Sequence, residues 1–193
     1  ESMVADSSKA IANPERTVMN RVLASEPRLD DLQIEIDREA IRLITIYSPA
    51  ARDLRFLLML ARINSELERI GDQAVNNIEY AELLGPHPPD QPLVELSRMS
   101  ATALEMTRDA LHAFRTEDLG QAQAVMHRDD EIDGMNARLV RDMLDRKVSD
   151  HEIAARSIAL LIGRSLERIA DHATNICEEG FYLGKGEENR PRP

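Results

Sequence analysis

The sequence of 193 residues contains a single cysteine, no tryptophan and only six aromatic residues in all. Cys177 therefore cannot form a disulfide within the chain, and nothing here requires an oxidising compartment, so we expect a cytoplasmic protein. No apolar run approaches the roughly 20 residues that a membrane-spanning helix needs, so the sequence predicts no direct membrane span. The first residues also lack the pattern of a signal peptide.

Positive charge is scarce as well. The chain has 24 Lys and Arg residues against 35 Asp and Glu residues, which gives a net charge of −11. Such an acidic protein repels phosphate backbones unless a basic face is segregated, and the sequence shows no such face. Few aromatic side chains are present to stack on bases. We therefore expect no nucleic acid partner, and the same electrostatic argument disfavours anionic membrane surfaces.

The strongest feature that is present is an internal repeat. Residues 67–76 read LERIGDQAVN, and residues 166–175, which lie 99 positions later, read LERIADHATN. Seven of the ten positions are identical, and the exchange of Gly71 for Ala170 keeps a small residue, as close helix packing requires. A repeat of this kind predicts two copies of one structural unit.

Apolar residues recur every three or four positions along most of the chain, and no segment alternates as a strand does. The pattern predicts helices over residues 1–12, 14–48, 50–84, 93–114 and 150–183, with another between the capping residues 116–118 and 149–150. Asn13 and Pro14 are the expected cap and first residue of the second helix. We therefore predict an all-α fold of two tandem three-helix bundles, residues 1–84 and 93–184. Residues 85–92 are the expected proline-rich linker, and residues 185–193 an expected disordered tail.

Four acidic pairs share the spacing Glu/Asp-x-x-x-Asp, and they fall on the last two helices of each unit. In the repeated motif the pair lies about 160° from the apolar stripe of its helix. Asp30 is 18 residues before Ser48 and Glu68 is 19 residues after Pro49, so an antiparallel hairpin brings the two carboxylates to the same height. The second unit shows the same correspondence. The predicted groups are Glu26, Asp30, Glu68 and Asp72 in the first unit, and Asp129, Asp133, Glu167 and Asp171 in the second.

Four carboxylates that face one another across two helices repel unless protons or a cation neutralise them. A hard metal ion with oxygen ligands meets that requirement. The Glu-x-x-His element of di-iron bundles is missing, because His172 is five residues after Glu167 and position 73 of the first copy is Gln. His172 is expected to be an ordinary histidine on the helix surface. The spacing leaves open two alternatives to a metal-binding adaptor, a carboxylate-bridged metalloenzyme and a purely structural helical scaffold with solvated acids.

Residues 68–72 (ERIGD), residues 167–176 (ERIADHATNI) and residues 49–55 (PAARDLR) resemble the PhoU family of phosphate-uptake regulators. The ending Tyr182-Leu183 also fits this family, and the similarity extends over nearly the whole chain. The resemblance implies two three-helix bundles in tandem and a cytoplasmic protein that frequently forms a homodimer. It also implies that the Glu/Asp-x-x-x-Asp motifs, which are the two groups of four acids above, bind multinuclear iron or zinc clusters.

The same resemblance implies a non-enzymatic negative regulator of the phosphate-starvation response. Its expected partners are the ATPase subunit of a phosphate ABC transporter and a membrane sensor histidine kinase.

The chain departs from the family in three ways. The first helix is shorter, so we expect it to be truncated at its N-terminus, and Asn77 replaces an apolar residue. Glu26 directly precedes Pro27, so ligation by Glu26 requires the helix to tolerate a kink there.

Overall fold

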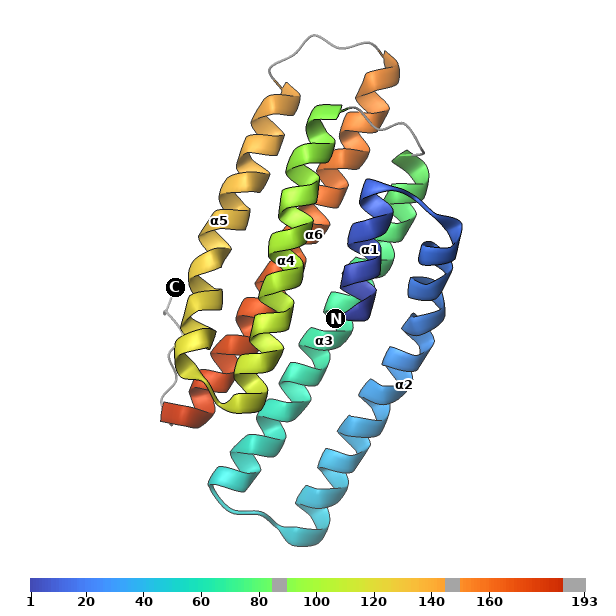
Figure 1. Ribbon diagram of the computed structural model, residues 1–193. Coiled ribbons are helices and arrows are strands. Elements are labelled where there is room, and N and C mark those ends of the chain that lie inside the picture. The colour runs from blue at the N-terminus through green and yellow to red at the C-terminus, as the bar shows by residue number, and fades with distance from the viewer. Residues whose placement is uncertain (85–89, 145–149, 186–193) are drawn as a thin grey trace.

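The computed structural model describes residues 1–84, 90–144 and 150–185, and these residues form helices with no strand among them. The helices are α1 (Ser2–Ala12), α2 (Arg16–Tyr47), α3 (Arg52–Leu84), α4 (Asp90–Thr116), α5 (Leu119–Leu144) and α6 (Asp150–Lys185), as Figure 1 shows. The prediction of an all-α fold is confirmed. Within the described ranges, no helix combines the length and the apolar character needed to cross a membrane.

The prediction that Asn13 caps the second helix is wrong. Asn13 instead ends α1, where its backbone N–H donates to the carbonyl of Lys9 at 2.8 Å. Its extended backbone then carries the chain to Glu15, which is the N-cap of α2. The side-chain amide of Asn13 donates to Glu15 at 3.1 Å, so the residue closes the turn between the two helices and does not start the second one.

The helix α2 continues through Pro27 as one helix of 32 residues. Because proline has no N–H, the carbonyl of Leu23 receives no helical hydrogen bond from position 27. The helix ends where Ser48 adopts a left-handed conformation with φ of 44° and donates its N–H to the carbonyl of Ile44 at 3.0 Å. The expected end before Pro49 is confirmed.

The predicted linker, residues 85–92, and the predicted tail, residues 185–193, both contain residues that the structure shows to be helical. The helix α4 already begins at Asp90, and Pro92 is tolerated because the first turn of a helix needs no internal N–H donors. The helix α6 ends at Lys185, the first residue of the expected tail. Residues 85–89 and 186–193 lie outside the described residues.

The two units meet through α3 and α6, which contact each other more extensively than any other pair of helices. The two helices run antiparallel, and α1 lies against α4 with the same relative direction (Figure 1). As a result, the hairpins α2–α3 and α5–α6 extend toward opposite ends of the molecule. The repeat in the sequence thus appears as an approximate two-fold relation between the units.

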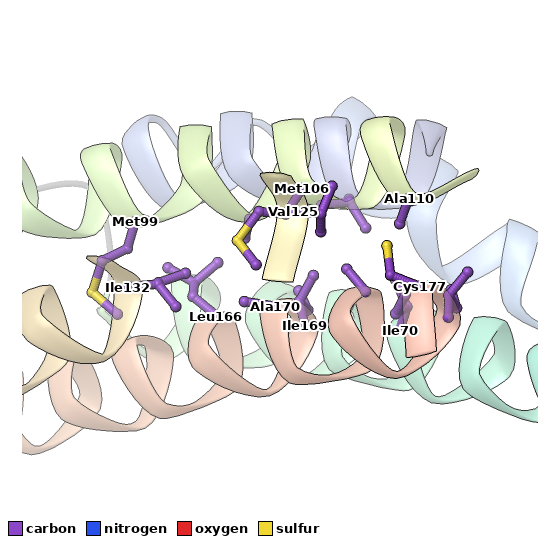
Figure 2. Close-up of a cluster of buried hydrophobic side chains, with 14 of the residues drawn as sticks. Ile70, Met99, Met106, Ala110, Val125, Ile132, Leu166, Ile169, Ala170 and Cys177 are labelled. Atoms are coloured by element: carbon purple, nitrogen blue, oxygen red, sulfur yellow. The ribbon is translucent and has the colours of Figure 1, made fainter. Parts of the chain in front are cut away.

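One continuous apolar core crosses the junction between the units. Ile70 of α3 packs in the same cluster as side chains of α4, α5 and α6 (Figure 2). Cys177 belongs to this cluster, and burial raises the pKa of its thiol to about 12, so Cys177 is a small core residue whose thiolate form is disfavoured. Fully buried members of the core include Met59, Ile63, Met99, Met106, Ile132, Leu139, Ile162, Leu166 and Ile169.

Asn77 is a polar exception within this packing. Its side chain is fully buried, and neither atom of its amide has a hydrogen-bond partner among the described residues. The repeat offset of 99 residues relates Asn77 to Ile176, which is buried in the apolar core. An unpaired buried amide costs free energy, so the first unit is less favourably packed at this position than the second.

We predict that Leu166→Ala lowers the free energy of unfolding by about 2–5 kcal/mol, because Leu166 is fully buried and its removal leaves a cavity. Leu161→Ala is the matched control, since Leu161 lies on the same helix but is 47% exposed, and it should cost less than about 0.5 kcal/mol. Urea denaturation of both variants measures the difference. Equal losses would contradict the placement of the core.

Candidate functional site

The repeated motif lies at the junction of α3 and α6, where its two copies face each other. Ser165 donates its hydroxyl to the backbone carbonyl of Gln73 at 3.1 Å, and Nδ1 of His172 lies 2.8 Å from Oε2 of Glu66. The repeat offset of 99 residues makes Glu66 equivalent to Ser165 and Gln73 equivalent to His172. The two contacts are therefore related by the approximate two-fold axis. The axis therefore passes between the two copies of the motif.

The second predicted group of acids is brought together on the α5–α6 hairpin. Burial, and after it the negative charges of Asp171 and Asp133, raise the pKa of Asp129 from 3.8 to about 6. Burial and the charges of Glu167 and Asp133 likewise raise the pKa of Asp171. Burial and the charge of Glu167 raise the pKa of Asp133. All four carboxylates therefore lie within electrostatic reach of one another, as the spacing predicts.

The first predicted group is less complete. On the α2–α3 hairpin, burial raises the pKa of Glu68, and the charges of Asp72 and Asp30 raise it further. Glu26 is not among the groups that act on Glu68. It is partly buried one position before Pro27 in α2. The structure thus places Asp30, Glu68 and Asp72 together and shows no interaction that joins Glu26 to them.

Both groups have the chemistry for a hard cation, since they consist of carboxylates alone. Within the described part of the chain, however, no three His, Cys, Asp or Glu side chains converge closely enough to hold one ion. Glu167 is instead held by the amide of Asn136 at 2.7 Å and by the guanidinium of Arg164, while Thr174 donates to Asp129 at 3.4 Å. These donors offset part of the repulsion within the α5–α6 group in the arrangement observed. The donor set fits a metal, and a metal would have to replace Asn136 and Arg164 at Glu167.

The PhoU domain family matches residues 1–81 and 96–180 of the chain. The chain belongs to the PhoU domain family. The resemblance noted from the repeated motif is confirmed.

Several PhoU proteins are similar over almost the whole chain. The phosphate-specific transport system accessory protein PhoU homolog of Caulobacter vibrioides is 38% identical over 97% of this chain and 83% of that protein. The phosphate-specific transport system accessory protein PhoU of Escherichia coli K12 is 31% identical over 98% of this chain and 79% of that protein. The crystal structure of PhoU from Pseudomonas aeruginosa superposes with a TM-score of 0.90 at 29% identity, over 96% of this chain and 90% of that one. These likenesses confirm the tandem helical bundles of the PhoU fold.

The prediction that His172 is a surface histidine is wrong. The residue is only 8% exposed, because α6 presents it to α3 at the junction of the units. Glu66 accepts a hydrogen bond from Asn175 at 2.9 Å and also lies 3.4 Å from Arg69. His172 is also near enough to Glu68 and to Asp171 to interact electrostatically with each, so the histidine lies close to both acidic groups.

Sequence reasoning also missed Glu66 and Asn136, which position site residues without belonging to the repeated motif. Glu66 stands where the second unit has Ser165, so the comparison of the repeats conceals it. Asn136 is three residues after Asp133 on α5, and it meets Glu167 from the opposite helix of the hairpin. The spacing of three residues from Asp133 is a signal that could have placed Asn136 on the same side of the helix.

We predict that Asp129→Asn stabilises the metal-free protein at neutral pH. An aspartate with a raised pKa binds more protons in the folded than in the unfolded state, so stability falls as pH rises from about 4 to about 6. The amide removes this loss. The melting temperature should therefore rise by about 2–4 °C at neutral pH for each 1 kcal/mol recovered, and by nothing below about pH 4.

Asp142→Asn is the matched control for this measurement, because Asp142 is an exposed aspartate on the same helix. Both variants are melted in the presence of a chelator across the pH range. A gain for Asp129→Asn that is the same at acidic and neutral pH would contradict an ionisation effect.

Proposed function

We propose that this protein is a metal-binding cytoplasmic adaptor that restrains phosphate uptake and phosphate-starvation signalling. The proposal places it between the ATPase subunit of a phosphate ABC transporter and a membrane sensor histidine kinase. The observation that supports it most is the combination of PhoU family membership with two groups of facing carboxylates. Relatives that are similar over almost the whole chain are named accessory proteins of phosphate-specific transport systems.

In this proposal the acidic groups are the metal sites. Asp129, Asp133, Glu167 and Asp171 would hold ions on one hairpin, and Asp30, Glu68 and Asp72, with Glu26 as a further ligand, on the other. Iron or zinc bound there would neutralise carboxylates that otherwise repel one another. Asn136 and Arg164 hold Glu167 until it turns toward the ion. His172, hydrogen-bonded to Glu66 close to both groups, would keep the hairpins in a fixed relation.

The adaptor acts through protein contacts and has no catalytic step of its own. Its metal ions have structural or sensing roles in this proposal, because bound ions cross-link the two helices of each hairpin. The homodimer implied by the family resemblance would present two copies of these surfaces to the partners. Light scattering of the purified protein tests that association directly.

The metal content of protein purified without a chelator or a metal-affinity column tests the metal sites. We predict bound iron or zinc, with a loss of part of it in Glu68→Ala/Asp72→Ala and a comparable loss in Glu167→Ala/Asp171→Ala. The reason is that each double variant removes two carboxylates from one group and leaves the other group intact. Far-UV circular dichroism should show that both variants keep their helicity.

Glu35→Ala/Glu39→Ala is the matched control, because these exposed residues of α2 have the same spacing of four. Its metal content should equal that of the unaltered protein. Absence of bound metal, with no thermal shift on adding iron, zinc, manganese or magnesium, would contradict the metal sites and leave a solvated acidic scaffold. Turnover of oxygen or of a phosphoester after metal loading would instead indicate a metalloenzyme.

The partner contacts require their own measurement. We predict that the purified transporter ATPase subunit or the cytoplasmic domain of the sensor kinase, from the same organism, binds the immobilised protein. Titration by surface plasmon resonance gives the affinities, and the two acidic double variants show whether metal loading affects them. Failure of both partners to bind would exclude the adaptor role and leave the metal sites unaffected.

A further inference from the structure

The turn between α2 and α3 forms an uncharged apex at one end of the molecule. Its residues 46–51 read Ile-Tyr-Ser-Pro-Ala-Ala. Figure 1 shows that this hairpin extends past the α4–α5 turn and past the end of α6. An ion pair of 3.1 Å between Arg62 and Glu179 anchors α3 to α6 farther from the apex. Met59 of α3 is still buried in the core, and Phe56 lines a cavity with α4, α5 and α6, so the part of the hairpin that projects is its end nearest the turn.

Large apolar side chains are exposed around this apex. On α2, Ile41 is 66% exposed, Ile46 58% and Tyr47 68%, and Phe56 and Leu58 of α3 are exposed as well. Successive helical residues are about 100° apart, so Ile46 and Tyr47 lie about 140° and 240° around the helix from Ile41. The exposed apolar residues thus surround the end of α2 and do not form one stripe.

The same segment is basic although the chain as a whole is acidic. Between Arg38 and Arg62 there are five arginines but only two acids, Glu39 and Asp53, in a chain whose net charge is −11. Arg38 is exposed and forms no ion pair with any described residue. Arg42 is paired with Glu39 and Arg62 with Glu179, so this end of the molecule has a local excess of arginine and not a segregated basic face.

The other two turns that the structure describes have the opposite character. Glu15 lies in the turn between α1 and α2, and Glu117 and Asp118 lie in the turn between α4 and α5. Exposed arginines flank these turns too, Arg16 at the start of α2 and Arg115 near the end of α4, but no large apolar residue described beside either turn is exposed. The combination of exposed apolar residues with flanking arginines is therefore specific to the α2–α3 apex among the described turns.

From these features we infer that the α2–α3 apex inserts into the surface of a membrane with anionic headgroups. Ile46 and Tyr47 enter the boundary between headgroups and acyl chains, and the flanking Arg38, Arg42 and Arg52 contact lipid phosphates. This is the arrangement by which amphipathic segments with a basic rim bind anionic lipid. The inference does not depend on the proposed role in phosphate signalling.

The shape of the apex favours lipid over a protein partner. Apolar side chains that point in several directions are all covered when the apex enters a fluid, whereas one protein face would cover only some of them. A cavity of about 470 Å³ does lie beside Phe56, but Glu117 and Asp118 contribute to its lining and disfavour anionic ligands there. The lipid surface is therefore assigned to the apex and not to the cavity.

Glu117 and Asp118 of the α4–α5 turn lie beside Arg52 and oppose this contact, whereas the acids that precede Arg38 on α2 lie farther from the apex. The last ten residues of α2 span about 15 Å along the helix axis, so the apex lies about that far from the residues of α2 that precede them. The Debye length is about 10 Å at 0.1 M salt, so acids farther up the hairpin are largely screened from the membrane. Arg52 is paired with Glu117 only at 3.9 Å, and both side chains are well exposed, so Arg52 remains free to exchange partners.

Vesicle co-sedimentation tests the inference. The full chain is mixed at about 0.1 M salt with vesicles of phosphatidylglycerol and phosphatidylcholine in equal parts, or of phosphatidylcholine alone. We expect the chain to bind the anionic vesicles and to bind the neutral vesicles at least about tenfold more weakly. Ile46→Ser/Tyr47→Ser and Arg38→Glu/Arg52→Glu should each reduce the anionic binding by about tenfold or more, because they remove the apolar and the electrostatic contribution respectively.

The matched controls lie elsewhere on the surface. Leu83→Ser/Val94→Ser removes two apolar residues that are 68% and 58% exposed, and Arg98→Glu/Arg108→Glu reverses two exposed charges on α4. Both controls should bind vesicles as the unaltered chain does, and circular dichroism should show equal helicity in all variants.

Absence of binding to the anionic vesicles, or equal binding by the apex variants and their controls, would overturn the inference. Loss of binding to the transporter ATPase, the kinase domain or a second copy of this chain in the apex variants, without any lipid binding, would make the apex a protein surface instead. Metal content should not change in any of these variants, so the result is independent of the metal sites.

Discussion

The antiparallel packing of α3 against α6 is the constraint on which the rest of the structure depends. Each of these helices uses one apolar face for the shared core and must also pack against the other helices of its own unit. Gly71 shows how little space remains, since a Cβ atom there would lie within 2.2 Å of the side chain of Leu29 on α2. The acidic residues of the motif therefore lie at the seam of each hairpin, whereas His172 and Asn175 face Glu66 across the α3–α6 junction.

This placement has an energetic cost. Burial and, after it, the mutual repulsion of carboxylates in one seam raise the pKa values of Asp129, Asp133 and Asp171. The protein offsets part of this repulsion with the donors Asn136 and Arg164. Stable folds do not need such a concentration of like charge, so the arrangement is typical of a site that is kept for function at the expense of stability.

Most of the fold could be predicted from the sequence because its signals are local or repeated. Apolar periodicity gives the helices, and counting from the turns gives the facing of Asp30 with Glu68. The burial of His172 could not be predicted, because its partner Glu66 is 106 residues away in the chain and has no counterpart in the repeat. The role of Asn13 was missed for a different reason: an asparagine next to proline can end one helix as well as begin another, and only the path of the chain decides.

The contacts at the two-fold axis show how the two halves of the chain have diverged. Glu66 meets His172 on one side of the axis, whereas Gln73 meets Ser165 on the other. Two copies of the first half would set Glu66 against Gln73, and two copies of the second half would set Ser165 against His172. Neither pairing reproduces the hydrogen-bonded Glu66–His172 contact of the intact chain. Each half therefore supplies one partner of the Glu66–His172 contact that the other half lacks, so after duplication of an ancestral unit the two halves would no longer be interchangeable at the axis.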